Sequence, residues 1–81
     1  MKLSHAVGQA LRNVRLEKGY TLRKVNNKCF VSIGQICDIE RGHKGTSPET
    51  LEVIATQGLG ITVEQLLDEI NQALQGKVVT K

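Results

Sequence analysis

The side chains best suited to bind a ligand are concentrated in one stretch of the chain, residues 21–46. Within it, Ile36 and Ile39 are spaced by about one helical turn, so a helix over residues 32–41 is expected to bury that face. The opposite face carries small or hydrogen-bonding groups, with Ile33 as its one large apolar side chain. A helix of this diameter fits the major groove of DNA, where such groups reach the edges of bases. The predicted base-contacting residues are Ser32, Ile33, Gly34, Gln35 and Asp38.

Two of these residues have further expected features. Ile33 is placed to touch the methyl group of a thymine. The carboxylate of Asp38 faces a polyanion, which leaves two alternatives open. Either it accepts a hydrogen bond from the amino group of a cytosine, or it is a surface acid that pairs with a nearby basic side chain.

Groups that suit phosphates lie on both sides of that helix. Thr21 is expected to cap a short helix over residues 21–29, whose free N–H groups and positive dipole end suit an anion. The loop after Gly42 adds further donors, among them His43 as a weak phosphate donor or a solvated loop residue. The predicted phosphate-binding residues are Thr21, Arg23, Lys24, Arg41, His43, Lys44 and Thr46.

The charge of the chain is divided between its two halves. Residues 12–44 hold eight of the eleven Lys and Arg residues but only three acids, whereas residues 45–81 carry a net charge of −3. Such asymmetry favours a basic half that faces a polyanion. Scattered solvated charge explains the same numbers about equally well if charge alone is considered.

Apolar periodicity and capping residues predict five helices and no strand. The first covers residues 4–18, is capped by Ser4 and ends at Gly19. Ser32 caps the third, and Ser47 followed by Pro48 begins the fourth. The apolar positions expected to face inward on the first and fourth helices are Leu3, Val7, Leu11, Val14, Leu51, Ile54 and Ala55.

The fifth helix is predicted to open with a capping box formed by Thr62 and Gln65. It presents Val63, Leu66, Leu67, Ile70 and Leu74 and ends near Gly76. Residues 1–76 are therefore expected to form one all-α domain, a compact five-helix bundle, and residues 77–81 a short C-terminal tail. The 81-residue chain has one Phe, one Tyr and no Trp, which argues against domains that stack bases on aromatic side chains.

Several motifs follow one another along the chain, namely Gly19-Tyr20-Thr21-Leu22, Val31-Ser32, Ile36, Ile39-Glu40-Arg41-Gly42 and Pro48-Glu49-Thr50-Leu51. The chain resembles the lambda Cro/repressor-type (XRE-like) helix-turn-helix regulators over residues 7–55, and again from Leu59 after an apparent one-residue insertion near Gly58. The resemblance implies a lambda-repressor-like bundle whose second and third helices form the helix-turn-helix. It also implies a homodimer that binds a palindromic operator as a repressor-like transcriptional regulator.

The resemblance also assigns roles to single residues. It implies a structural ion pair between Arg15 and Glu40, which fixes packing more than it adds stability. Leu22 replaces a common Gln, so one usual phosphate contact falls to Arg23 instead. Asn26 replaces a small residue and is expected to crowd the contact with the third helix. Phe30 stands in the turn where a Gly with positive φ is often used.

No cofactor, metal site or catalytic constellation is expected. The cysteines Cys29 and Cys37, with His5 and His43, match no common zinc spacing and are predicted to be core thiols. No nucleophile motif or deep pocket is apparent, so the chain is not expected to be an enzyme. Without a signal peptide or a long apolar run, a cytoplasmic protein with no membrane contact is predicted.

Four apolar residues near the C-terminus extend past what a five-helix core needs: Ile70, Leu74, Val78 and Val79. They are predicted to form a dimer interface, the alternative being a longer helix packed on its own domain. A rival interpretation is an antitoxin or a restriction–modification controller-type protein, whose C-terminal helix binds a protein partner. A third and weaker one is an anti-repressor that has lost DNA binding.

Overall fold

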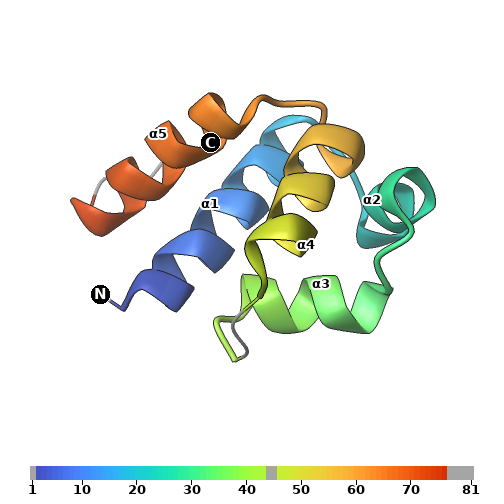
Figure 1. Cartoon of the computed structure of the whole chain (residues 1–81), viewed down its shortest axis with the longest axis horizontal. Helices are drawn as coiled ribbons and strands as arrows, with labels where there is room; N and C mark the ends of the chain where they lie inside the picture. The colour runs from blue at the N-terminus through green and yellow to red at the C-terminus, as the bar shows by residue number, and fades with distance from the viewer. Residues whose placement is uncertain (1, 44–45, 77–81) are drawn as a thin grey trace.

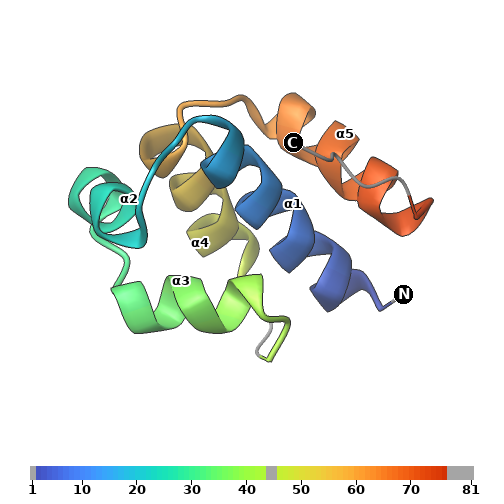
Figure 2. The ribbon, with the colours of Figure 1, turned by 180° about the vertical axis from the view of Figure 1, so that it is seen from behind.

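Helix α1 (Leu3–Glu17) runs through the middle of the fold, between α5 on one side and the helix-turn-helix on the other (Figure 1). The computed structural model describes residues 2–43 and 46–76. The same arrangement seen from behind shows α5 alongside α1 and α3 across the lower edge of the molecule (Figure 2). The remaining elements are α2 (Leu22–Cys29), α3 (Ile33–Glu40), α4 (Pro48–Val53), the π-helical turn η1 (Ile54–Gly58) and α5 (Val63–Leu74).

The predicted all-α, five-helix architecture is confirmed, and most helix starts lie where the capping residues placed them. The hydroxyls of Thr21 and Ser32 accept hydrogen bonds from backbone N–H groups three residues ahead, each at 3.1 Å. Ser47 caps α4 in the same way at 3.2 Å. The capping box of α5 is complete, with Thr62 and Gln65 bonded in both directions. Each such bond satisfies an N–H group that the helix cannot pair internally.

The predicted start of the first helix is wrong. Helix α1 begins at Leu3, its capping position is Lys2, and no side chain caps it. The N–H of Ala6 already bonds to the carbonyl of Lys2 at 3.0 Å, so Ser4 lies inside the helix. Leu3 is consequently 62% exposed and is not part of the buried face that the periodicity assigned to it.

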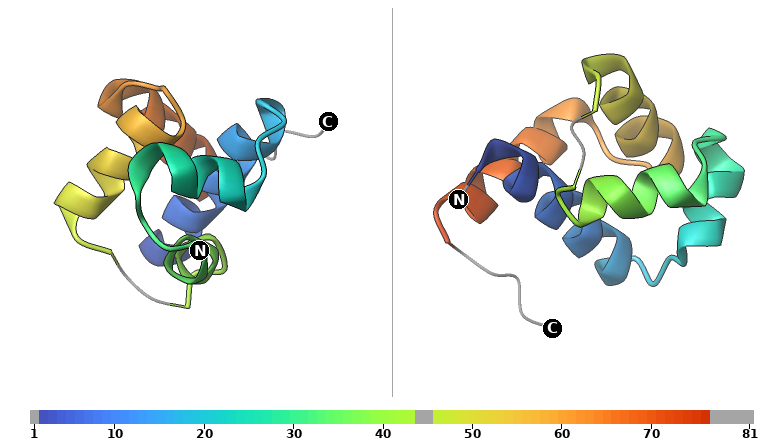
Figure 3. Two further views of the ribbon diagram at one scale, coloured as in Figure 1. Left: turned by 90° about the vertical axis from the view of Figure 1, so that its right-hand side faces the viewer. Right: turned by 90° about the horizontal axis from the view of Figure 1, so that it is seen from below.

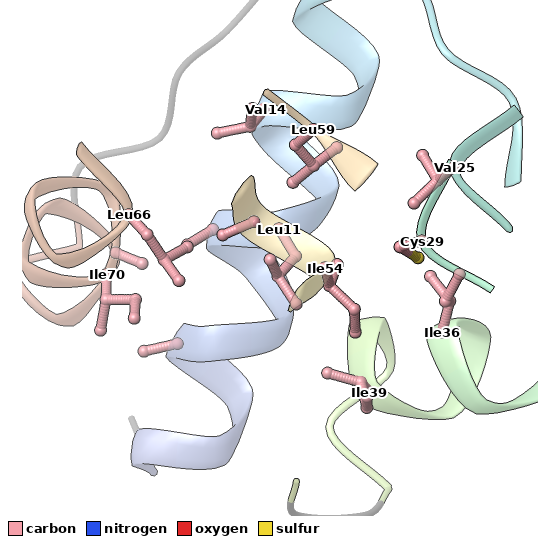
Figure 4. Packing of buried hydrophobic residues seen from close by; sticks show 14 residues of the cluster. Leu11, Val14, Val25, Cys29, Ile36, Ile39, Ile54, Leu59, Leu66 and Ile70 are labelled. Atoms are coloured by element: carbon pink, nitrogen blue, oxygen red, sulfur yellow. The ribbon is translucent and has the colours of Figure 1, made fainter. Parts of the chain in front are cut away.

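The core is aliphatic, as the composition predicts. Leu11, Ile54, Leu59 and Leu66 are each 1–2% exposed and meet where α1, η1 and α5 converge (Figure 4). Ile36 of α3 is 1% exposed and adjoins the buried residues of α2. Burying Leu and Ile side chains contributes roughly 1.5–3 kcal/mol each. This cluster therefore fixes the orientation of α3 relative to the rest of the bundle.

Helix α4 ends at Val53 and continues as the π-helical turn η1, which ends at Gly58. The N–H of Leu59 bonds to the carbonyl of Ile54, five residues back, at 2.9 Å. A π-helical turn accommodates one more residue than an α-helical turn. It lies where the family resemblance places a one-residue insertion, near Gly58. A Cβ on Gly58 would lie 2.9 Å from Val25 Cγ1, so the backbone of η1 packs closely on α2.

Candidate nucleic-acid interface

Four consecutive residues at the start of α3 form an exposed surface. Ser32, Ile33, Gly34 and Gln35 are all exposed, whereas Asp38, one turn further along, is half-buried. The opposite side of the helix is held in the core by Ile36 and Ile39, at 1% and 2% exposure. Looking along α3, Figure 3 (left) shows α2 crossing over it while its other side faces away from the molecule. The structure thus brings four of the five predicted base-contacting residues together at one accessible helix end.

An ion pair holds α3 against α1. The Nε of Arg15 lies 2.7 Å from Oε2 of Glu40, and one terminal nitrogen lies 3.0 Å from Oε1. The other terminal nitrogen of Arg15 donates to the carbonyl of Tyr20 at 2.9 Å. The side chains are only 12% and 7% exposed. The hydrogen bonds that Arg15 donates to Glu40, and to a lesser degree the charge of that carboxylate, raise the pKa of Arg15 despite the opposing effect of burial.

Helices α1 and α3 also approach each other closely at Gly8. A Cβ at this position would lie 2.2 Å from the carbonyl oxygen of Ile39 and 2.7 Å from that of Glu40. No side chain fits such a gap, because the atoms it would meet belong to the backbone of α3. Gly8 and the ion pair therefore set the position of the C-terminal half of α3.

Asn26 was expected to crowd the contact between α2 and α3, but it has a different role in the turn between them. Its side-chain amide donates a 2.7 Å hydrogen bond to the carbonyl of Val31, so Asn26 stabilises the turn instead of crowding it. Phe30 adopts a left-handed conformation with φ of 62°. That conformation costs a non-glycine residue roughly 1–2 kcal/mol. The positive φ common at this turn is thus kept without glycine.

The predicted phosphate-binding residues do not all have the same environment. Arg23, Lys24, Arg41 and His43 are exposed on the two sides of α3, while the hydroxyl of Thr21 already caps α2. Lys44 lies outside the described residues. Thr46 was expected to contact phosphate, but its Oγ1 is buried and has no hydrogen-bond partner among the described residues. It lines an apolar pocket with Val7, Ile39 and Leu51, among others, so its hydroxyl is not available to a phosphate.

A cationic cluster that sequence patterns did not reveal surrounds Tyr20. The ammonium groups of Lys24 and Lys28 lie 4.8 and 4.9 Å from the centre of its ring, within the range of cation–π attraction. Lys28 also donates to the phenol oxygen at 3.5 Å. This hydrogen bond and then the charge of Lys28 lower the pKa of Tyr20. The spacing of Lys24 and Lys28 by one turn was visible in the sequence, but the position of the ring was not.

The outer face of α5 differs from the predicted dimer interface. Ile70 is 7% exposed and packs into its own core, because that face of α5 is turned toward α1. Leu74 is 43% exposed, and so are Val63 and Leu67 at 42% and 58%. Val78 and Val79 lie outside the described residues. Beside this face, burial and then the charges of Glu17 and Asp68 raise the pKa of Glu69.

The thiols and possible metal ligands are unremarkable in position. Cys29 is buried in the core as predicted, whereas Cys37 is only half-buried. Within residues 2–43 and 46–76, no three His, Cys, Asp or Glu side chains are grouped to hold a metal ion. None of the helices in this part of the chain has the length and apolar character needed to cross a membrane.

Comparison with known proteins gives one consistent result. No protein-family model matches the chain. The transcriptional regulator ClgR of Mycobacterium tuberculosis is 46% identical over 50 residues, covering 62% of this chain and 45% of ClgR. The crystal structure of the clp gene regulator ClgR from C. glutamicum has a TM-score of 0.83 and 36% identity, covering 91% of this chain and 95% of that one.

A second group of structures shares the fold. The restriction–modification controller protein C.Esp1396I, as a tetramer with its natural 35 base-pair operator, has a TM-score of 0.75 and 29% identity. The match covers 88% of this chain and 97% of that one. The chain spans about half the length of the curated relatives it matches. Because a regulator more than 30% identical is covered almost completely, this chain belongs to the lambda Cro/repressor-type (XRE-like) helix-turn-helix family of transcriptional regulators.

Proposed function

We propose that this chain is a DNA-binding transcriptional regulator that inserts the start of α3 into the major groove of an operator. The observation that carries the proposal is the exposed run of residues 32–35 on a helix whose other face is fixed in the core. Its side chains include Gln35, which suits a bidentate contact with adenine. The hydroxyl of Ser32 accepts from a backbone N–H and still has a proton to donate.

Exposed cations on either side of α3 would supply most of the affinity. Arg23 and Lys24 lie at the start of α2, and Arg41 follows α3. His43 is a further exposed hydrogen-bonding side chain after α3. Contacts from such groups to phosphates release counterions and are independent of sequence. Lys28 joins this set, because its ammonium group and that of Lys24 lie at similar distances from the Tyr20 ring, 4.9 and 4.8 Å from its centre. The proposal therefore assigns base selection to one set of residues and binding of the DNA backbone to another.

The proposed regulator acts as a homodimer through the outer face of α5. Val63, Leu67 and Leu74 recur at helical spacing on that face and are 42–58% exposed. A two-fold contact would bury this apolar surface and would place two copies of α3 on a palindromic site. Residues 1–76 would form the DNA-binding unit, with residues 77–81 as a tail.

Sedimentation experiments test the proposed homodimer. The wild type is expected to be dimeric at micromolar concentration, and Leu67→Glu is expected to be a folded monomer with weaker DNA binding. Gln57→Glu, on an exposed position of η1 outside α5, is the matched control for added charge. A wild type that stays monomeric and acquires a dimer-like mass only with another protein would favour the partner-binding alternative.

Selection from a random pool of duplexes tests the DNA-binding function itself. The wild type is expected to enrich a palindrome with half-sites spaced by about one or more helical turns of roughly 10 base pairs. Gln35→Ala should relax the preference at one base pair of each half-site, which corresponds to about 1–3 kcal/mol. A wild type that enriches no sequence and binds no duplex would overturn the proposal.

A further inference from the structure

Phe30 combines a left-handed backbone with an exposed ring, and the packing of the fold does not explain why a phenylalanine occupies this turn. Its φ of 62° lies in the left-handed region that glycine adopts without strain. Its side chain is 87% exposed, the highest value among the exposed large apolar residues of the described chain. The ring therefore contributes almost nothing to the core that would offset the strained backbone. Strained residues of this kind occur preferentially at binding sites.

Phe30 adjoins the proposed base-contacting residues in the chain. It lies two residues before Ser32, the capping residue of α3. In Figure 3 (left), the link from α2 to α3 curves out on the side opposite to the start of α2. The bond from the Asn26 amide to the carbonyl of Val31 supports the backbone of this link, on which Phe30 stands.

A second exposed apolar side chain follows within the same helix start. Ile33 is 37% exposed. In the sequence, Phe30 and Ile33 lie on either side of the polar Ser32. The apolar groups that B-form DNA presents near a bound helix are thymine methyls in the major groove and the carbons of deoxyribose. An exposed aromatic ring at this place matches those CH groups and offers nothing to a phosphate.

We propose that Phe30 is a DNA contact, whose ring packs on apolar CH groups of the operator beside the bases contacted by Ser32 and Ile33. The proposal rests on the DNA-binding function proposed above. It gives the turn between α2 and α3 a contribution to DNA affinity that does not depend on charge. The strain at Phe30 is then retained because glycine, although better suited to the turn, would lose this contact.

The test uses a duplex that the wild type selects from a random pool, in two versions. One contains thymidine and the other carries 2′-deoxyuridine at every thymidine of the half-sites, which removes only the methyl groups. Phe30→Gly removes the ring and relieves the turn, and Phe30→Leu keeps an apolar side chain. Leu16→Ala, which truncates a residue of α1 that is 53% exposed, is the control for loss of exposed apolar surface.

Phe30→Gly is expected to unfold at a higher temperature than the wild type and yet to bind the thymidine duplex about fivefold more weakly, or roughly 1 kcal/mol. The salt dependence of its affinity should not change, because no charge is lost. Phe30→Leu should recover part of the affinity. If the loss disappears on the deoxyuridine duplex, the contact is a thymine methyl, and if it persists, the contact is a sugar.

Two results would overturn the proposal. One is an affinity of Phe30→Gly equal to or higher than that of the wild type, which would point to a protein as the occupant. The other is an equal loss in Leu16→Ala. Both leave the DNA-binding function intact, provided that the wild type still selects a sequence. If the wild type selects none, the proposed function fails and the contact at Phe30 fails with it.

Discussion

The side-chain amide of Asn26 and the backbone carbonyl of Val31 form a 2.7 Å hydrogen bond that spans the turn between α2 and α3. Asn26 is half-buried in α2, and Val31 directly precedes the capping residue of α3. One bond thus joins the two helices of the motif at the point where the backbone passes through the strained Phe30. The orientation of α3 depends on this bond as well as on its apolar face.

Replacing Asn26 with Ala should therefore destabilise the fold and weaken DNA binding together. Losing the hydrogen bond is expected to cost about 1 kcal/mol, which lowers Tm by roughly 4–8 °C for a domain of this size. Thermal unfolding followed by circular dichroism measures the change. The matched control is Asn27→Ala, one residue along and exposed, which should leave Tm nearly unchanged. Equal effects of the two substitutions would show that the bond does not stabilise the turn.

Glu40→Gln should destabilise the chain more strongly than an ordinary surface substitution. It leaves the guanidinium of Arg15, 12% exposed, without its carboxylate. Breaking a buried ion pair on one side costs about 3–5 kcal/mol, and the residual exposure of Arg15 places the expected value at the lower end. Urea unfolding measures the loss, with Glu49→Gln at an exposed site as control. A loss below about 1 kcal/mol, typical of surface pairs, would contradict this account of the ion pair.

Two glycines in helices should respond to alanine in opposite directions. Gly8→Ala forces a Cβ into the backbone carbonyls of Ile39 and Glu40, and overpacking of this kind costs about 1–3 kcal/mol. Gly34→Ala meets nothing within 4 Å and should gain up to about 1 kcal/mol from helix propensity. Denaturant midpoints of the two variants give the comparison. Should Gly8→Ala prove as stable as Gly34→Ala, the close approach of α1 and α3 would be refuted.

Features encoded locally were predictable from the sequence. The caps at Thr21, Ser32, Ser47 and Thr62 follow from side chains that bond backbone groups three residues away, so no tertiary information was needed. The inward position of Ile36 follows from periodicity in the same way. The partnership of Arg15 with Glu40, 25 residues apart, came from family resemblance, because helical spacing says nothing about which helices meet.

Features that depend on packing between elements could not be predicted. Thr46 has a polar side chain in a loop, yet its oxygen is enclosed by apolar residues of the neighbouring helices. Ile70 and Leu74 are both apolar and one turn apart, and only the angle of α5 against α1 decides that one is buried and the other exposed. The widening of η1 likewise depends on how Gly58 packs against Val25.

The salt dependence of DNA binding tests the central claim most directly. Fluorescence anisotropy of a selected duplex, titrated at several salt concentrations, compares the wild type with Arg23→Gln and Gln35→Ala. Arg23→Gln is expected to weaken binding to all sequences alike and to reduce the slope of log affinity against log salt by about one unit. Gln35→Ala should keep the slope and lose discrimination between bases. Binding that does not depend on salt, or no binding to any duplex, would contradict the account.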